Sequence, residues 1–305
     1  MILNRIKSRN IISIVLTGIL LTLTAVVIIA PDSSKLSWIS NNAPQIMFIM
    51  LVVSFIFLAL DQKTMMVVGM ICTAIIAIYL KSASNEEGFL SNEYGENYFE
   101  IIYLVLDPDN TVADDLFEIT SGLDADAIVV QNYDEEWEAL FRSNLGLYYP
   151  HNYGFKTPDN TGAGIFTRNK ILRINNLKIN DDTNLQTVID FEESKIQLLA
   201  AKLPEDVVVE EEKYHEYLQS LASEVRDSRN PVLLMGDFKK VYWSKELINF
   251  RKQAQLENSR PSIGIENLNP EVHFFHSRKL ICTGFREIYG DENKLFGIFA
   301  AYTLK

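Results

Sequence analysis

Three long apolar runs without any charged residue or histidine occupy most of the first 80 residues, at 11–30, 44–60 and 64–80. A helix rises about 1.5 Å per residue, so about 20 residues cross the roughly 30 Å core of a bilayer. Only Asp61, Gln62 and Lys63 separate the second run from the third, which predicts a tight helical hairpin. A removed signal peptide is disfavoured, because no convincing cleavage site follows the first run and two more runs come after it. The sequence predicts a module of three transmembrane helices.

Basic residues at the N-terminus predict the orientation of this module. Arg5, Lys7 and Arg9 precede the first run, and residues 1–10 contain no acidic residue. Lys/Arg-rich ends stay in the cytoplasm, so residues 1–10 are predicted to be cytoplasmic. Three crossings then place the C-terminal domain on the periplasmic side of a bacterial inner membrane. Because no span holds an ionisable residue, the helices are interpreted as anchors rather than as an ion pathway.

The rest of the chain is strongly acidic. Residues 1–97 carry six of the 28 basic and six of the 40 acidic residues, so the formal net charge of −12 lies wholly in 98–305. Nucleic-acid affinity comes mainly from Lys and Arg, so the charge disfavours a nonspecific DNA- or RNA-binding role, and no nucleic-acid partner is expected. The two cysteines, Cys72 and Cys282, are not expected to form a bridge, and no Cys/His spacing resembles a zinc site.

Strand and helix patterns alternate after a polar linker at 81–97. The predicted strands cover 98–106, 127–130, 164–168, 185–191, 196–203, 232–235, 273–276, 284–289 and 296–304. The predicted helices cover 112–123, 135–145 and 214–228. Strands interleaved with helices, and paired strands near the end, predict an α/β domain with mixed sheets at 98–305.

Several segments of this domain resemble the endonuclease/exonuclease/phosphatase superfamily, in particular its bacterial membrane-anchored branch. The run Leu233–Phe238, followed by Trp243 and Ser244, is similar to the family strand that ends in Gly-Asp-Phe-Asn and precedes Pro-Trp-Ser. Further similar segments, in the family order, are Thr161–Arg168, Asp126–Gln131, His273–Ser277 and Phe296–Phe299. The resemblance implies a four-layer sandwich of two mixed β-sheets flanked by helices.

The resemblance also implies a divalent cation and a His–Asp pair that activates water, and the family positions for these are mostly replaced. The aspartate of Gly-Asp-Phe-Asn is kept as Asp237, and the late histidine as His273. The other catalytic positions fall at Val105, Asn132, Lys239, Val272, Lys294 and Leu295, and a further family histidine falls near Lys202. A leucine cannot accept a proton, so Leu295 removes general-base catalysis.

A kept scaffold with lost chemistry predicts a pseudoenzyme without catalytic residues, metal or other cofactor, in which Asp237 and His273 are vestiges. The predicted role is a structural or accessory subunit of a membrane protein complex, with partners bound through the helices and the acidic domain.

Two alternatives stay open. One is a divergent Mg- or Mn-dependent phosphoesterase whose ligands have moved to Asp107, Asp109, Asp237 and Asp291. The other is a sensor of a phosphorylated ligand, with positive charge supplied by Lys202, Lys239 and Lys294.

Three smaller features allow more than one interpretation. His273 and His276 lie three apart on one strand and so face opposite sides, which predicts a buried His273 and a surface His276. The aromatic run 148–153 is either a contact patch or packing beneath a sheet edge. The acidic run 205–212 is interpreted as a solvated loop that leads into a helix.

Overall fold

The computed structural model describes residues 2–29, 34–85, 98–106, 116–118, 120, 122–132, 134–157, 162–179, 182–203, 210–264, 267–290 and 294–305. These residues form two compact units. The helical unit comprises Met1–Glu86, Lys240–Leu247 and Ser262–Pro270. The α/β unit comprises Glu87–Lys239, Ile248–Pro261 and Glu271–Lys305.

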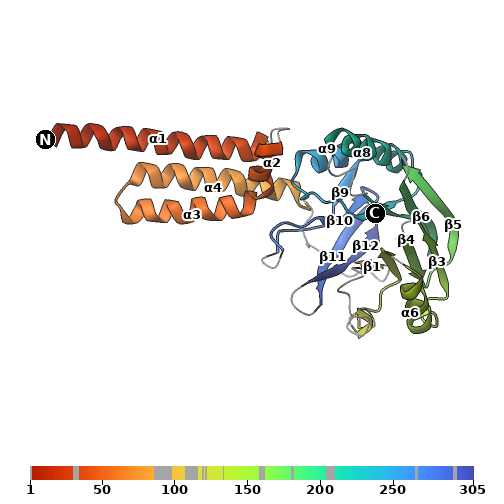
Figure 1. The fold of residues 1–305 in the computed structure, drawn as a ribbon. Coiled ribbons are helices and arrows are strands. Elements are labelled where there is room, and N and C mark those ends of the chain that lie inside the picture. The colour runs from red at the N-terminus through yellow and green to blue at the C-terminus, as the bar shows by residue number, and fades with distance from the viewer. Residues whose placement is uncertain are drawn as a thin grey trace. The chain divides into compact units, whose positions relative to one another are not determined.

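Four helices build most of the helical unit (Figure 1). They are α1 (Ile2–Ile29), α2 (Ser34–Asn41), α3 (Ala43–Ala59) and α4 (Lys63–Ala83). The predicted hairpin is confirmed, because α3 and α4 pack against each other across a short turn in which Asp61 has a positive φ of 57°. Gly69 lets the two helices approach, since a Cβ there would lie 2.2 Å from the Ser54 hydroxyl oxygen. The short helix α2 has no counterpart in the sequence-based expectation.

The described helices differ in how well they meet the requirements of a membrane span. Helix α4 is long and apolar enough to cross a bilayer by length and composition. The apolar stretches Ser13–Ile29 and Ala43–Ala59 are shorter. Helix α1 also begins well before the expected span and takes in the basic residues of the N-terminus. The coarser part of the expectation, an apolar helical module at the start of the chain, therefore holds.

The segment Lys240–Leu247 groups with the helices rather than with the sheets that flank it in sequence. Its buried Trp243 donates an indole hydrogen bond to the Ser40 carbonyl at 2.9 Å. The Trp243 carbonyl accepts a hydrogen bond from the Tyr79 hydroxyl at 2.6 Å. The Trp-Ser dipeptide of the family resemblance thus lies against helical residues within this unit.

The α/β unit contains two six-stranded sheets (Figure 1). The first has the order β11-β12-β1-β2-β4-β3 and the second β5-β6-β7-β8-β10-β9. Their bounds are β1 (Phe99–Val105), β2 (Ala127–Gln131), β3 (His151–Lys156), β4 (Gly162–Thr167), β11 (Leu280–Tyr289), β12 (Leu295–Leu304), β5 (Ile171–Ile179), β6 (Asp182–Phe191), β7 (Ser194–Lys202), β8 (Val232–Asp237), β9 (Leu256–Asn258) and β10 (Val272–Ser277). The pairs β1–β2 and β7–β8 are parallel and the others antiparallel, so both sheets are mixed, as expected.

Alternation along the strands builds separate cores on the two faces of the first sheet. Tyr103 and Val129 point into the core that the two sheets share, together with Leu198 and Met235 of the second sheet. Their neighbours on the strands form a second core under α6 (Glu135–Leu145), with Phe141 at its centre. On the second sheet, α8 (Glu211–Arg226) and α9 (Lys245–Ala254) cover the outer face. The two mixed sheets flanked by helices are confirmed.

Candidate functional site

The strands β1, β2 and β8 end at one edge of the α/β unit, which we term the carboxyl edge. Tyr103 of β1 and Asp237 of β8 are close there: burial, and then the Asp237 carboxylate, raise the pKa of Tyr103 well above its usual value. The Tyr103 hydroxyl donates to the Gln131 side-chain oxygen at 3.2 Å. Every family catalytic position that the structure describes lies on strands or turns that reach this edge or start from it.

The replaced positions on the first sheet have turned into packing residues. Val105 packs against the core between the sheets, and so does Leu295 at the start of β12. Asn132 stands just after β2 with a positive φ of 59°, and its side-chain amide donates to the Leu106 carbonyl at 3.0 Å. These side chains therefore close the ends of β1 and β2 and supply no free carboxylate.

The retained aspartate is neutralised by its own neighbour. The Lys239 ammonium contacts the Asp237 carboxylate at 2.5 Å, and the Lys239 backbone N–H donates to the same carboxylate at 3.2 Å. Lys239 has a positive φ of 53°, which brings its side chain back over the strand end. The family resemblance implies an asparagine at position 239, next to a metal ion. In this chain the ammonium of Lys239 supplies a positive charge there instead.

Glu271 is a second carboxylate at this edge that the sequence analysis did not identify. Burial, and then the nearby Asp237, raise the pKa of Glu271, while Lys239 lowers it. Its carbonyl accepts from the Phe238 backbone N–H at 2.9 Å, which fixes the start of β10 against the end of β8. The signal available in the sequence was its place directly before Val272, one of the positions that the resemblance aligns with a family catalytic residue.

The two histidines of β10 are both buried, which corrects one expectation. His273 packs its ring on Phe275 at 5.5 Å and on Phe238 at 6.0 Å, as a buried histidine should. His276, expected at the surface, is 0% exposed and lies 3.0 Å from the Ser259 hydroxyl. The reason is that His276 points, like Phe274, between the two sheets, where its ring lies 5.5 Å from the ring of Tyr302 on β12, so the first sheet covers this face of β10. Burial lowers the pKa of His276 to about 3.

Of the three lysines that the resemblance aligns with or near family catalytic positions, two lie beside Asp237. Lys202 ends β7 directly across from Asp237 in the sheet register, and Lys239 contacts that carboxylate. The backbone of Lys202 is fixed by the Asn184 side chain at 2.9 Å and by the Tyr217 hydroxyl at 2.9 Å. Lys294 precedes β12, and its carbonyl accepts from Gly290 at 2.9 Å.

A buried ion pair joins the two sheets near the carboxyl edge. Arg260 follows β9 of the second sheet and Glu287 lies on β11 of the first; their charged atoms are 2.8 Å apart and their side chains are 3% and 9% exposed. The guanidinium also donates to the Val272 carbonyl at 3.3 Å and lies over the Phe285 ring. Sequence analysis missed this pair, because only the strand order brings the two residues together.

The residues described at the carboxyl edge do not fit the magnesium site of the family. Magnesium is usually held by carboxylates together with substrate phosphates. Here Asp237 is already paired with the Lys239 ammonium, whose charge also lowers the pKa of nearby Glu271. Within the described ranges no three His, Cys, Asp or Glu side chains gather as metal ligands. Asp107, Asp109 and Asp291 of the relocated-ligand alternative lie outside the described residues.

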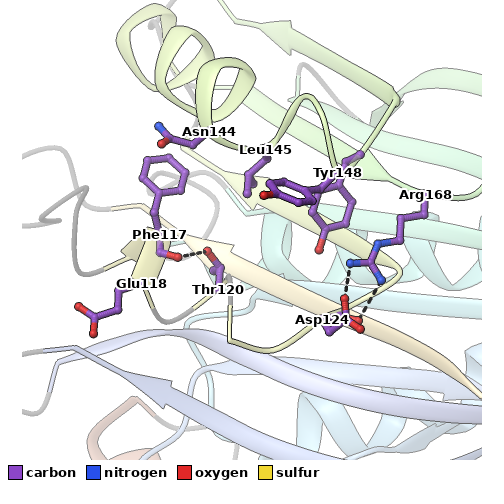
Figure 2. A pocket seen from close by; sticks show the side chains of 9 residues that line it. Phe117, Glu118, Thr120, Asp124, Asn144, Leu145, Tyr148 and Arg168 are labelled. Carbon is purple, nitrogen blue, oxygen red and sulfur yellow. Dashed lines mark hydrogen bonds and ion pairs between the residues drawn. The ribbon is translucent and has the colours of Figure 1, made fainter.

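The opposite edge of the first sheet, which we term the amino edge, carries an open pocket of about 470 Å³ (Figure 2). It lies between α6, the start of β2 and the end of β4. Its lining residues are Phe117, Glu118, Thr120, Asp124, Asn144, Leu145, Tyr148, Tyr149 and Arg168. Figure 2 shows the Arg168 guanidinium bonded to Asp124, with Tyr148 between Leu145 and Arg168.

Acidic groups outnumber basic ones at the amino edge. Arg168 contacts Asp124 and lies over the Tyr149 ring at 5.3 Å. Burial, and then the Asp126 and Asp124 carboxylates, raise the pKa of Glu100. Burial also raises the pKa of Asp126, although the Glu100 backbone N–H donates to it. The Arg168 guanidinium is therefore the nearby positive charge for three carboxylates, those of Glu100, Asp124 and Asp126.

The aromatic run 148–153 is interpreted either as a contact patch or as packing beneath a sheet edge, and its first two residues differ in this respect. Tyr148 is 67% exposed, and the preceding Leu147 is 93% exposed. Tyr149 is buried and donates its hydroxyl to the Ala125 carbonyl at 2.9 Å. The first tyrosine is thus available at the pocket mouth, and the second packs beneath the sheet edge.

Comparison with known proteins identifies the fold. No family model matches the chain, and no curated protein matches it. The structure is similar to an endonuclease/exonuclease/phosphatase from Bacteroides vulgatus (10% identity, TM-score 0.57), covering 69% of this chain and 100% of that one. It is also similar to D. rerio TDP2 humanized by 14 mutations (14% identity, TM-score 0.55), covering 68% and 99%. The human Nocturnin catalytic domain with bound sulfate gives 12% identity and a TM-score of 0.54, covering 70% and 95%. The α/β unit therefore has the endonuclease/exonuclease/phosphatase fold.

Proposed function

We propose that this chain is a membrane-anchored, non-catalytic protein that serves as a structural or accessory subunit of a membrane protein complex. One observation carries the proposal: the carboxylate retained at the carboxyl edge is paired with the chain's own Lys239. A lysine ammonium beside Asp237 opposes a divalent cation by direct charge repulsion. Val105 and Leu295 add apolar packing where metal-binding and proton-transfer groups would be needed.

The surface of the helical unit supports membrane anchoring. Large apolar side chains are exposed along all three long helices, among them Ile14, Phe48 and Ile78. A soluble protein seldom exposes so much contiguous apolar surface without a partner or a lipid phase to cover it. We infer three spans, with the basic N-terminus in the cytoplasm and the α/β unit on the far side.

The amino edge is the surface that we assign to a partner protein. Its pocket combines aromatic rings with an excess of carboxylates, and Tyr148 stands exposed at the mouth. Lysine and arginine side chains bind such places through ion pairs and through contact with ring faces. The net charge of −12 favours the same partner chemistry. The proposed occupant is a basic segment of a partner protein.

A cross-linking experiment tests this role on the full chain in native membranes. A photoreactive amino acid replaces Leu147, which is 93% exposed and directly precedes the lining residue Tyr148. The proposal predicts one discrete cross-linked protein, whose yield falls when Asp124→Lys reverses the charge of the pocket. A matched control carries the photoreactive residue at exposed Lys279, on the β10–β11 turn. Equal products from both positions, or none from position 147, would contradict the proposal.

A further inference from the structure

Helix α2 (Ser34–Asn41) connects α1 to α3 and is too short to cross a bilayer. Its eight residues rise only about 12 Å, whereas the hydrocarbon core is roughly 30 Å thick. Figure 1 shows α2 at the end of the helical unit that lies opposite the α3–α4 turn. This short helix therefore lies where α1 ends and α3 begins.

Three hydrogen bonds hold α2 in place. The hydroxyl of the buried Ser40 donates to the Val26 carbonyl of α1 at 3.2 Å. The Ser40 carbonyl accepts from the Trp243 indole at 2.9 Å. Directly after the helix, the Asn42 side-chain amide donates to the Trp38 carbonyl at 2.8 Å. The backbone of α2 is therefore fixed against α1 and Trp243.

Helix α2 also exposes large apolar side chains. Trp38 is 67% exposed, and Leu36 is exposed as well. The exposed apolar surface continues in the flanking helices, at Ile28 and Ile29 of α1 and at Phe48 of α3. Contact between so large an apolar ring and water is unfavourable. The fixed backbone keeps Trp38 in this position, so the surface around it is expected to have a partner.

The places of tryptophan and tyrosine indicate what this partner is. The sequence of residues 1–85 contains one tryptophan, Trp38, and one tyrosine, Tyr79. Both lie at the same end of the helical unit, because Trp243 donates to Ser40, two residues after Trp38, and accepts from the Tyr79 hydroxyl. Tryptophan and tyrosine concentrate where lipid meets water, since their rings are apolar and carry a polar group. This end of the unit therefore has the side-chain chemistry of a lipid interface.

We propose that α2 is an interfacial helix that binds the headgroup region of the extracytoplasmic leaflet, with the Trp38 ring inserted between lipids. This inference rests on the proposed anchoring of the helical unit in a membrane. Interfacial helices bury their apolar side about 5–10 Å into the boundary between headgroups and acyl chains. Because Trp243 bonds to α2, the segment Lys240–Leu247 is then held at the lipid surface.

Quenching of tryptophan fluorescence by brominated lipids tests this position, on the full chain in liposomes. Trp137 and Trp243 are buried, so a quencher in the lipid reaches Trp38 alone among the three tryptophans of the chain. The difference in emission between the wild type and Trp38→Phe gives the signal of Trp38. Bromine near the headgroup end of the acyl chains is expected to quench most of this signal, and bromine near the methyl end little of it, because the expected depth is about 5–10 Å.

A second reporter separates this inference from the anchoring on which it rests. Val52 is exposed near the middle of α3, and Val52→Trp is made in the Trp38→Phe background. If α3 spans the bilayer, bromine near the methyl end of the acyl chains quenches this reporter most. Quenching of the reporter without quenching of Trp38 would leave the anchoring intact and overturn the inference. Quenching of neither would overturn the anchoring, and the inference with it.

Acrylamide, a quencher dissolved in water, distinguishes other surroundings of Trp38. The inference predicts that lipid shields the ring, so acrylamide should quench the Trp38 signal less in liposomes than after unfolding in urea. Equal quenching in the two conditions would show a ring in water and would overturn the inference. Protection from acrylamide and from brominated lipid alike would show that a protein surface covers Trp38, for example a second copy of the chain, and would also overturn it.

Discussion

The carboxyl edge and the amino edge of the α/β unit both carry carboxylates beside a cation, but they differ in what fills the space next to these groups. At the carboxyl edge, Asp237 and Glu271 lie around Lys239, and apolar residues fill the neighbouring strand ends. At the amino edge, Glu100, Asp124 and Asp126 depend on Arg168 beside an open pocket. Among the described residues, the carboxyl edge is thus filled by packing side chains and an ion pair, while the amino edge carries an open pocket with an excess of carboxylates.

The largest expected effect comes from breaking the ion pair that joins the sheets near the carboxyl edge. Arg260→Met leaves Glu287 buried without its partner, and the free energy of unfolding should fall by roughly 3–5 kcal/mol. Urea unfolding of the full chain measures this effect. The matched control is Arg278→Met, which removes an exposed arginine paired with Glu257 and should cost less than about 1 kcal/mol. Equal losses in the two variants would show that the buried pair does not hold the sheets.

The second effect is a pH dependence of the free energy of unfolding, which we expect from the buried His276 of β10 and not from an exposed histidine. The pKa of His276 falls from 6.5 to about 3 on burial, so the unfolded chain binds one more proton than the folded chain between these values. The stability contributed by the neutral, buried His276 is therefore fully present above pH 6.5 and is lost as the pH falls toward 3. Over this range the free energy of unfolding should fall by up to about 1.4 kcal/mol per pH unit. Unfolding free energies measured from pH 7 to pH 4 should show this slope.

The His276→Gln variant should flatten that slope, because it removes the titrating group from the core. His215→Gln, at an exposed position on α8, should leave the slope as in the wild type. A wild-type slope that persists in His276→Gln would assign the titration to other groups.

The third effect tests whether Lys239 takes the place of a metal. Lys239→Asn places at this position the residue that the family motif has and removes the ammonium that contacts Asp237 and lowers the pKa of Glu271. Magnesium at ten times its dissociation constant should then raise the free energy of unfolding by about 1.4 kcal/mol in the variant and leave the wild type unchanged. Lys240→Asn, which breaks the pair with Glu246 instead, is the matched control. Stabilisation of the wild type by magnesium would contradict the argument.

The smallest effect concerns the amino edge. Tyr148→Ala removes an exposed ring from the pocket mouth and should weaken binding of an oligo-lysine peptide about two- to fivefold, since such contacts contribute roughly 0.5–1 kcal/mol. Isothermal titration of the full chain at low salt measures this change. Tyr98→Ala, another exposed tyrosine of the α/β unit outside the pocket, should bind like the wild type. A loss of affinity in both variants would mean that the peptide binds to the acidic surface in general.

The strand and helix patterns predicted an α/β domain with mixed sheets, and the family resemblance implied that there are two. The patterns did not predict the strands β3, β5 and β9 or the helix α9. The sequence also predicted which family positions had changed, and the structure places Val105 and Leu295 in packing roles there. It could not predict the Arg260–Glu287 pair, since that pair depends on which strands become neighbours. His276 was misplaced because alternation distinguishes two faces of a strand but does not say that both are covered.

The most direct test of the central claim is hydrolysis of phosphodiesters and phosphomonoesters by the full chain. The assay uses Mg²⁺ and then Mn²⁺, with Asp237→Ala beside the wild type. The account predicts the same background rate for both proteins, because the retained carboxylate is paired with Lys239 and the neighbouring catalytic positions are filled by packing residues. Metal-dependent turnover by the wild type that disappears in Asp237→Ala would show a working active site and would contradict the account.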